Sequence, residues 1–249
     1  DRMGLAHLAA SSEQNGFRAI PVPADWDFDG SHAYLHYVSN ETISGVQFQR
    51  PPEVAQTLVA DMSSDILSRP VDVSKFGVIY AGAQKNIGPA GLCLAIVRRD
   101  LLGRSREGTP AMLDWQVAAD NDSMYNTPPT FAIYLAGLVF EWLEELGGLN
   151  EMAAINQKKA STLYGVIDGS DFYHNPVERQ SRSLMNVPFT LVDAALDAAF
   201  LKGAEAAGLL NLKGHRSVGG MRASLYNAVE QTSVEVLCDF MKDFERRYG

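Results

Sequence analysis

Hydrophobic and polar positions give the first part of the chain the pattern of a sheet. Short apolar runs rich in β-branched and aromatic residues alternate with polar or Gly/Pro-rich segments. Runs such as Val78-Ile79-Tyr80 are apolar without interruption, which is typical of parallel strands buried on both faces in an α/β domain. We predict strands over residues 17–22, 34–38, 57–60, 77–80 and 92–97.

After Pro129 the pattern becomes helical. Apolar residues recur there every three or four positions, at Phe131, Tyr134, Leu135, Leu138, Val139, Trp142 and Leu143. Gly147-Gly148 ends this helix, and a second helix begins near Asn150 and runs toward Tyr164. Residues 5–10 have the pattern of a helix already under way, so we expect the chain to begin inside a domain.

The remaining sequence predicts a small α+β unit. Its pattern indicates a strand over 185–191, a helix over 192–208, a strand over 218–226 and a helix over 234–247. We therefore expect two domains that meet near Gly147-Gly148. The first, over residues 1–147, is part of a larger α/β domain, and the second, over 148–249, is a small C-terminal α+β domain.

Composition narrows the class of protein. The 249 residues are 46% hydrophobic and 20% charged, which is ordinary for a soluble globular protein, and the net charge is −9. No basic stripe with interleaved aromatics occurs, so we expect no nucleic-acid partner. No apolar stretch reaches the roughly 18 residues of a membrane span. Cys93 and Cys238 lie in apolar runs outside any CxxC pattern, so we expect two buried thiols, no metal site and a cytoplasmic location.

A single lysine follows one of the most apolar predicted strands. Residues 80–84 become small toward their end, Lys85 comes next, and a Gly/Pro-rich loop over 86–91 follows. Small residues let a flat ligand approach the backbone, and an apolar strand end favours the neutral amine that imine chemistry needs. The alternative is an ordinary surface lysine in a turn.

An acid occupies the end of an earlier apolar strand. Asp61 follows 57–60 and precedes Lys85 by 24 positions (85 − 61). A carboxylate there is suited to pair with a protonated pyridine nitrogen and keep such a ring electron-withdrawing. The alternative is a capping role in Asp-x-x-Ser, with Ser64 as the fourth residue. The strand-end lysine downstream favours the first interpretation.

Two polar turns are further candidates. Thr42 follows the strand over 34–38, where its hydroxyl is able to bond a ligand's phenolic oxygen or phosphate, and ordinary turn chemistry is the alternative. Asn126-Thr127 precedes the long amphipathic helix, where donors beside a helix N-terminus suit a phosphate. Simple capping, with Pro128-Pro129 in the first turn, explains that segment equally well.

A cationic cluster stands out in this acidic protein. Lys213, His215, Arg216 and Arg222 lie within ten residues that also hold three glycines. Arg222 falls within a predicted strand, where a charge needs a partner, and a guanidinium matches a carboxylate through two parallel hydrogen bonds. The cluster favours capture of an acidic substrate over a strand edge that merely carries charge.

Together these segments resemble the phosphoserine aminotransferases, which are class V aminotransferases among the fold-type I pyridoxal-phosphate enzymes. The resemblance extends over residues 34–249. The stretches that carry it are His36-Tyr37, Asn40-Glu41-Thr42-Ile43, 66–70, 80–91, 124–130, 182–187 and 213–227. It implies a large cofactor-binding domain with a mostly parallel sheet, incomplete here, and a small C-terminal α+β domain.

The resemblance also implies roles within one subunit. Lys85 would form the Schiff base with pyridoxal phosphate and carry the proton between Cα and C4′. Asp61 would pair with the pyridine nitrogen, Thr42 would bond the ring oxygen or the phosphate, and Gln84 would contact the phosphate.

Other implied roles involve the substrate and a second subunit. Arg222 would hold the substrate α-carboxylate. Asn126 and Thr127 would reach the cofactor phosphate of the neighbouring subunit, which makes the active form a homodimer. His215 and Arg216 would meet the substrate's phosphate or side-chain acid across the dimer interface.

The implied reaction is reversible transamination between O-phosphoserine with 2-oxoglutarate and 3-phosphohydroxypyruvate with glutamate, on the route to serine, with pyridoxine biosynthesis as a second context in some members. The family's N-terminal portion, with further cofactor contacts, is absent, so we expect weak binding of pyridoxal phosphate. Strong visible absorbance from the purified chain with the cofactor would contradict this.

Two alternatives remain open. One is another class V enzyme, such as a cysteine desulfurase or an alanine–glyoxylate aminotransferase. The apolar setting of both cysteines argues against a desulfurase, and the His215-Arg216 pair favours a phosphorylated substrate. The other is a catalytically incomplete fragment that keeps the fold. A hydrolase is not expected, because no serine lies in a nucleophile-elbow pattern.

Overall fold

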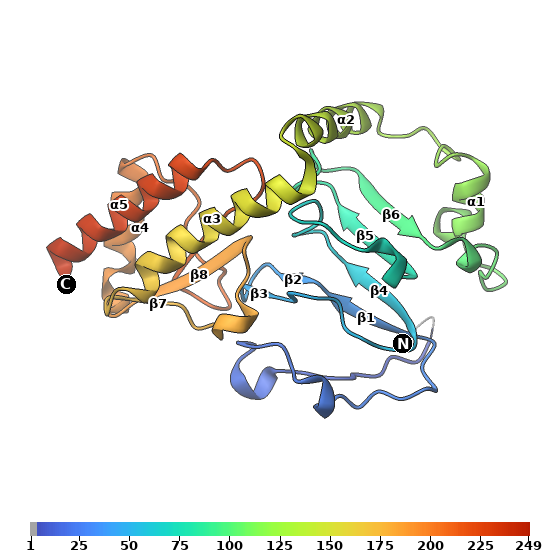
Figure 1. Ribbon diagram of the computed structural model, residues 1–249, viewed down its shortest axis with the longest axis horizontal. Helices are drawn as coiled ribbons and strands as arrows, with labels where there is room; N and C mark the ends of the chain where they lie inside the picture. The colour runs from blue at the N-terminus through green and yellow to red at the C-terminus, as the bar shows by residue number, and fades with distance from the viewer. Residues whose placement is uncertain (1–3) are drawn as a thin grey trace.

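A four-stranded sheet forms the centre of the first body in the computed structural model, which describes residues 4–249 (Figure 1). Its order is β1-β4-β5-β6. Strands β1 (Tyr34–Val38), β4 (Thr57–Asp61) and β5 (Val78–Gly82) are parallel, and β6 (Cys93–Val97) runs antiparallel to β5 at the edge. The predicted mostly parallel sheet is confirmed, with small shifts at the strand ends.

One face of this sheet carries the first hydrophobic core. Leu58, Ala60, Ile79 and Ala81 alternate along β4 and β5 and are buried, while the residues between them are partly exposed. The expectation of complete burial on both faces is therefore wrong for the described residues. The uninterrupted apolar runs reflect one buried face and one face that is half covered.

A short antiparallel hairpin of β2 (Asn40–Glu41) and β3 (Val46–Gln47) follows β1 and reaches the second body. Gly45 in its turn has φ +73, and an added Cβ would lie 2.3 Å from Cδ of Pro188. Only glycine fits this close approach without displacing the neighbouring strand. The hairpin therefore joins the two bodies.

Helices α1 (Trp115–Asp120) and α2 (Thr130–Glu145) follow the sheet, and the turn after α2 contains Gly147, whose φ is +105. Only Ala132, Ala136 and Leu143 of α2 are buried. Large apolar side chains stay exposed on this helix, namely Phe131, Ile133, Tyr134, Leu138, Phe140 and Trp142. The periodicity that predicted the helix thus describes a largely uncovered apolar surface.

The second body contains a three-stranded antiparallel sheet and three helices. Its strands are β7 (Tyr173–His174), β8 (Asn186–Leu191) and β9 (Met221–Ser224), in the order β7-β8-β9. Helices α3 (Gly148–Asp168) and α5 (Gln231–Tyr248) run side by side, with α4 (Asp197–Ala206) beside α5 (Figure 1). A second core, separate from the first, forms around residues such as Phe200 and Met241.

Several predicted elements differ from the structure. Residues 17–22 are irregular instead of a strand, because Phe17 has φ 60 and the prolines at 21 and 23 lack an N–H. Residues 5–10 are not helical, and residues 1–3 lie outside the described part. Strand β9 begins only at Met221, because Gly219 and Gly220 have positive φ.

The helix predicted over 192–208 starts later than expected. A 3₁₀ turn over Ala194–Leu196 precedes α4, and the Asp193 side chain accepts a hydrogen bond from the Ala195 N–H at its start. Asp at such a position competes for backbone donors and delays the helix. The two remaining helices, α3 and α5, extend beyond the residues that periodicity indicated.

Candidate active site at the carboxyl end of the sheet

Lys85 lies just past β5, where the carboxyl ends of the parallel strands meet. Its half-buried side chain extends toward the second body. Nζ is 2.9 Å from the phenol oxygen of Tyr226 and 3.4 Å from Oγ1 of Thr42. The flanking Ala81 and Ala83 are fully buried, so the backbone here carries little bulk. A primary amine at a strand end, held by two hydroxyl groups, is a suitable nucleophile for an aldehyde.

Thr42 connects Lys85 to Arg222. It follows the hairpin strand β2, and its hydroxyl is the group near Lys85 Nζ. Its main-chain carbonyl accepts a hydrogen bond of 3.3 Å from Nη1 of Arg222. The structure therefore brings together three residues that the sequence separates by up to 180 positions.

Arg222 lies on β9, opposite Pro188 of β8. Its Nε is buried and has no hydrogen-bond partner among the described residues, and none of the ion pairs within residues 4–249 includes this arginine. A buried N–H group without an acceptor is costly. The vacant donor is consistent with an anionic ligand whose carboxylate completes the pair.

Asp61 ends β4, one strand away from Lys85, in register with Tyr80. Its Oδ1 accepts a 2.8 Å hydrogen bond from the Ser63 N–H, which is the local capping contact that the alternative interpretation expected. Burial and then the Asp61 charge raise the pKa of Glu41, and the same two causes raise the pKa of Tyr80. Asp61 thus ends the strand next to the one that leads to Lys85, with Oδ1 engaged by Ser63.

A buried acid that the sequence did not single out lies beneath Asp61. Asp65 accepts hydrogen bonds from the Ser39 hydroxyl and from Nε2 of Gln47, the latter at 3.0 Å, and lies 3.6 Å from Arg69. Burial raises its pKa above the ordinary value, although these donors oppose that shift. Ser39 also bonds the Asp61 carbonyl. This network fixes the hairpin and the end of β4 relative to one another.

The remaining candidates do not join this cluster within one chain. Gln84 is exposed, and its amide folds back toward Gly82. Asn126 and Thr127 are exposed in the segment before α2, with no hydrogen bond to Lys85 or Thr42 in the part that the structure describes.

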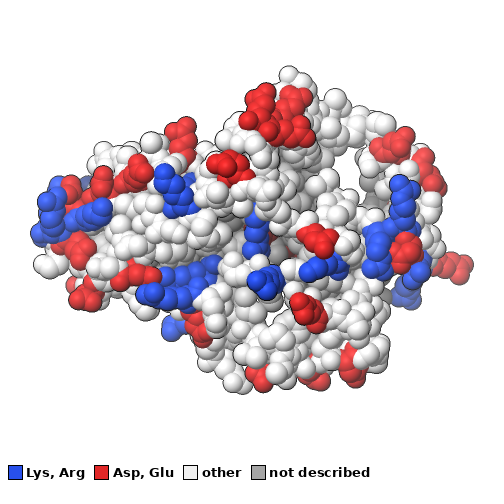
Figure 2. Space-filling view, viewed as in Figure 1, with Lys and Arg blue, Asp and Glu red and all other residues white. Residues whose placement is uncertain are grey.

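His215 and Arg216 are also apart from the cluster. Both are exposed in the turn before β9, where Nδ1 of His215 lies 2.7 Å from the Ser217 hydroxyl. They are on the segment that leads to Arg222, but neither contacts it in residues 4–249. Figure 2 shows small groups of basic and acidic side chains on this face of the molecule, without a broad basic stripe.

Sequence reasoning missed Tyr226 and Asn186. Asn186 starts β8, and its Nδ2 lies 3.2 Å from the Tyr226 phenol oxygen. Tyr226 follows β9 at the spacing Arg222-x-Ser224-x-Tyr226. Alternate residues of an extended segment share one face. That period of two was the available signal, but the predicted strand was judged only by its cations.

One expectation about the cysteines is wrong. Cys93 is exposed, because β6 is an edge strand whose outward residues lack a covering layer within residues 4–249. Cys238 is buried as predicted. No candidate metal cluster of His, Cys, Asp or Glu is found in the described range, and no helix in that range is long and apolar enough to cross a membrane.

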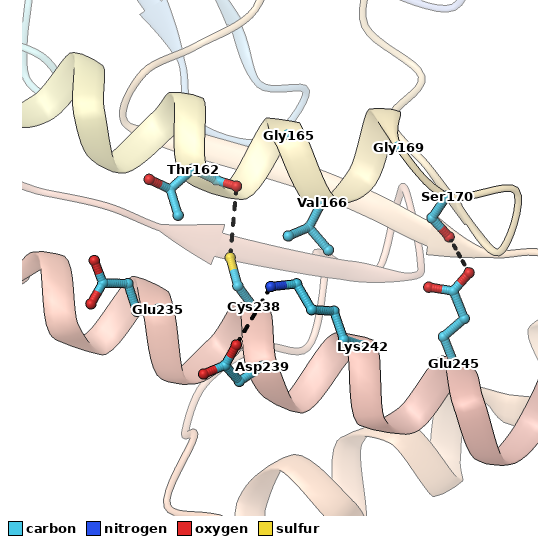
Figure 3. Close-up of a pocket in the computed structure, with 10 residues that line it drawn as sticks. All are labelled: Thr162, Gly165, Val166, Gly169, Ser170, Glu235, Cys238, Asp239, Lys242 and Glu245. Atoms are coloured by element: carbon cyan, nitrogen blue, oxygen red, sulfur yellow. Dashed lines mark hydrogen bonds and ion pairs between the residues drawn. The ribbon is translucent and has the colours of Figure 1, made fainter.

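A groove runs between α3 and α5 (Figure 3). Its polar groups largely satisfy each other, since Lys242 pairs with Asp239 and Ser170 donates to Glu245. Burial raises the pKa of Cys238 in its wall to about 11, so that thiol stays protonated at neutral pH. None of the candidate residues lines this groove.

Comparison with known proteins identifies the family. The profile of the family described as aminotransferase class-V matches residues 11–237. Phosphoserine aminotransferase of Azotobacter vinelandii is 60% identical over 249 residues, which are 100% of this chain and 69% of that protein. That of Pseudomonas aeruginosa strain LESB58 is 58% identical over the same shares.

Solved structures agree. Phosphoserine aminotransferase from Bacillus circulans subsp. alkalophilus superposes with a TM-score of 0.96 at 48% identity, over 100% of this chain and 69% of that one. An alanine–glyoxylate aminotransferase from Nostoc sp. matches with a TM-score of 0.71 at 17% identity over 85% of this chain and 61% of that one, a likeness of fold alone. The predicted fold-type I architecture is confirmed. The chain belongs to the class V aminotransferase family and, within it, to the phosphoserine aminotransferases.

Proposed function

We propose that this chain is a pyridoxal-phosphate-dependent aminotransferase that exchanges the amino group between O-phosphoserine with 2-oxoglutarate and 3-phosphohydroxypyruvate with glutamate. The observation that carries the proposal is the juxtaposition of the Lys85 amine and the unpaired Arg222 guanidinium on either side of Thr42. Family membership supports the same activity, whose place would be serine biosynthesis.

The residues present fit the cofactor. An amine lies just past the end of β5, a carboxyl group with Oδ1 engaged by Ser63 lies at the end of β4, and the residues at 81–83 that lead to the amine are only alanine and glycine. When bound, pyridoxal phosphate supplies a ring that takes up the electron pair released as the substrate Cα–H bond breaks. Lys85 would hold the cofactor covalently and accept the proton from Cα, while Asp61 would keep the ring nitrogen protonated.

Substrate binding would rest on the cationic residues. Arg222 would bind the α-carboxylate through its vacant Nε and a second guanidinium nitrogen. Thr42 would bond the cofactor's ring oxygen or phosphate. Because its carbonyl also accepts from Arg222, it would fix the distance between the cofactor and Arg222. Gln84, at the loop that carries Lys85, would contact the cofactor phosphate after a change of side-chain rotamer.

A homodimer is part of the proposal. Four candidate residues are exposed and make no hydrogen bond with Lys85 in residues 4–249, namely Asn126, Thr127, His215 and Arg216. They would therefore act on the neighbouring subunit's site. The apolar side chains that α2 leaves exposed support an extensive contact.

We also propose a domain boundary at Gly147-Gly148 and a cytoplasmic location. Separate cores on the two sides support the former, and two unpaired cysteines support the latter.

Borohydride reduction in the presence of millimolar pyridoxal phosphate, followed by peptide mapping, tests the cofactor site even if binding is weak. The expected result is a label at Lys85 that is lost in Lys85→Ala and kept in Lys75→Ala, which changes an exposed lysine in a turn. A label at other lysines but not at Lys85 would refute the assignment. Amino transfer from O-phosphoserine to 2-oxoglutarate, assayed separately, tests the substrates.

A further inference from the structure

A chain of buried hydrogen bonds ends at the Lys85 amine, and the direction of each bond from Ser183 as far as Tyr226 is determined. It begins at Ser183, whose Oγ accepts from the main-chain N–H groups of Met185 and Asn186, each at 3.0 Å. These two donors cannot reverse their role, and they occupy both lone pairs of the hydroxyl. Ser183 must therefore donate its own proton, which it does to Oδ1 of Asn40 at 2.5 Å.

The orientation of Asn40 follows from that bond. Because its Oδ1 accepts from Ser183, its Nδ2 faces Ser64 and Asn186, and donates to the Ser64 hydroxyl at 2.8 Å and to Oδ1 of Asn186 at 2.9 Å. Ser64 gives an independent check, since it donates its own proton to the Asn40 carbonyl at 2.7 Å and so has to accept from the amide. Asn40 and Asn186 are both buried to within 1% of full burial.

Asn186 then transmits the same direction to Tyr226. Its Oδ1 is the acceptor for Asn40, so its Nδ2 donates to the Ser224 hydroxyl and to the Tyr226 phenol oxygen, each at 3.2 Å. Because the phenol oxygen accepts a hydrogen bond from Asn186, the phenol O–H cannot donate to Asn186. The other neighbour of the phenol oxygen is Lys85 Nζ at 2.9 Å.

The contact between Tyr226 and Lys85 is with the hydroxyl and not with the ring. Nζ is 2.9 Å from the phenol oxygen but 5.2 Å from the ring centre, so it lies beyond the oxygen. A phenol in this position donates to the lone pair of a neutral amine and accepts from an ammonium group. It serves both protonation states without moving.

We propose that Tyr226 is a positioning residue for Lys85, and that Asn186 directs the phenol O–H toward the lysine amine. This rests on the proposed role of Lys85 and adds a partner that holds the amine and exchanges a proton with it at Nζ. Tyr226 keeps the amine directed while Lys85 carries a proton to and from the substrate. Asn40 and Ser183 act only by fixing the orientation of Asn186.

Two conservative substitutions distinguish the effect of the phenol's hydrogen-bond direction from the effect of side-chain size. Tyr226→Phe removes the hydroxyl and keeps the ring. Asn186→Asp keeps the shape and the acceptor for Asn40 but replaces the amide donor with a second acceptor oxygen, so the phenol would donate to the introduced carboxylate and no longer to Lys85. The charged groups on the elements that meet here are Asp61 of β4, Glu41 of β2, Arg222 of β9 and Lys159 of α3, whose Nζ bonds the Tyr226 carbonyl, and all four are retained.

Competitive acetylation of the cofactor-free chain with acetic anhydride, read by peptide mass spectrometry, measures the free amine directly. Lys75 in the same sample is the internal standard. From a rate profile fitted below about pH 10, where a phenol keeps its proton, the rate constant of the neutral Lys85 amine should rise by roughly two- to tenfold in Tyr226→Phe and in Asn186→Asp, because an amine lone pair loses a hydrogen bond of about 0.5–1.5 kcal/mol. The double variant should match Tyr226→Phe alone.

Other results would overturn the proposal. These are an unchanged rate in both single variants, or an effect of Asn186→Asp that persists in full when it is combined with Tyr226→Phe. Should Asn186→Asp fail to fold, Tyr226→Phe still decides, through the acetylation rate constant of its neutral Lys85 amine and through a kcat for phosphoserine lowered on the order of tenfold to hundredfold with KM within about threefold. Borohydride labelling of the wild-type chain stays a separate result: failure at Lys85 refutes the cofactor role and leaves the acetylation comparison valid.

Discussion

Asn156 of α3 donates a hydrogen bond of 2.9 Å from Nδ2 to Oδ1 of Asn227, and the same Nδ2 donates to the Ser68 carbonyl at 3.0 Å. Asn227 in turn donates from Nδ2 to the Leu67 carbonyl and from its backbone N–H to Oδ1 of Asn86. Three asparagines thus join α3, the loops after β4 and β5, and the segment after β9. They fix the two bodies relative to each other next to Lys85 and Tyr226.

Replacement of Asn156 should therefore destabilise the protein strongly. Asn156→Ala leaves two buried acceptors without their donor and should lower the free energy of unfolding by about 2–3 kcal/mol. Asn156→Asp should cost more, because a buried carboxylate would face two acceptors. Urea denaturation measures both. Gln157→Ala, an exposed neighbour on the same helix, is the matched control and should stay within about 0.5 kcal/mol of wild type. A similar loss in the control would show that the effect does not depend on the asparagine network.

Arg222 should contribute to binding and not to stability. Its Nε is buried without a partner among the described residues, so Arg222→Gln relieves a desolvated donor and should leave the free energy of unfolding unchanged or higher. Loss of the charge–carboxylate contact should cost about 2–4 kcal/mol in substrate binding, or roughly 30- to 900-fold in KM for glutamate.

Steady-state kinetics and thermal melts distinguish these effects. Arg99→Gln, which changes an exposed arginine in a 3₁₀ turn beside β6, serves as the control and should alter neither quantity. An unchanged KM in Arg222→Gln would remove the carboxylate from its proposed partner. Arg222→Lys should recover only part of the binding, because an ammonium group lacks the fork that bonds both carboxylate oxygens.

The elements that sequence predicted well are those whose pattern is local. Strand β4 and helix α5 show their periods of two and 3.6 within the sequence, and both were found with small shifts at their ends. Residues 17–22 were mispredicted as a strand because the β-branched and aromatic residues there were given more weight than the prolines at 21 and 23. In the structure Phe17 also has a positive φ, which a strand does not allow. Propensity describes the half-buried surface that a residue fits, and this segment has no neighbouring strand to provide one.

The site shows the same division. Lys85 and Asp61 were found because each ends an apolar strand, which is a local signal. Tyr226 and Asn186 were not found, because their significance depends on contacts between segments 141 and 40 positions apart. Asp65 was missed because a buried acid next to serine and arginine residues has no pattern of its own until the hairpin folds over it.

Lys159 provides a prediction about pH. Its side chain is fully buried, and Nζ bonds the carbonyls of Tyr226 and Val229 at 2.9 Å each and that of Leu225 at 3.2 Å. Burial lowers the pKa of Lys159 from 10.5 to about 8. Between these values the unfolded chain binds more protons than the folded chain, so the free energy of unfolding should gain a rising contribution as the pH increases from about 8 to 10.5.

Lys159→Met should remove that rising contribution. It should also lower stability by about 2–4 kcal/mol at pH 7, because several buried carbonyls lose their common donor. Urea denaturation at pH 7.5 and 9.5 compares the two proteins, with the exposed Lys158→Met on the same helix as control. An equal pH slope in wild type and Lys159→Met would mean that other groups produce the dependence.

Asp65 should give a slope of the opposite sign at acidic pH. Burial raises its pKa above 3.8, so just above that value the folded chain binds more protons than the unfolded chain, and its contribution to stability should fall as the pH rises through this window.

Asp65→Asn should abolish this contribution and remain folded. Its carbonyl oxygen can accept from Gln47, while Ser39 turns its own proton to the Asp61 carbonyl, 3.1 Å away. The expected stability at pH 7 is within about 1 kcal/mol of wild type. Asp65→Leu leaves the Gln47 amide without its acceptor and Arg69 without its ion-pair partner, and should lose about 3 kcal/mol or more. Denaturation between pH 4 and 7 measures all three proteins, and a slope in Asp65→Asn equal to that of wild type would assign the titration to another carboxylate.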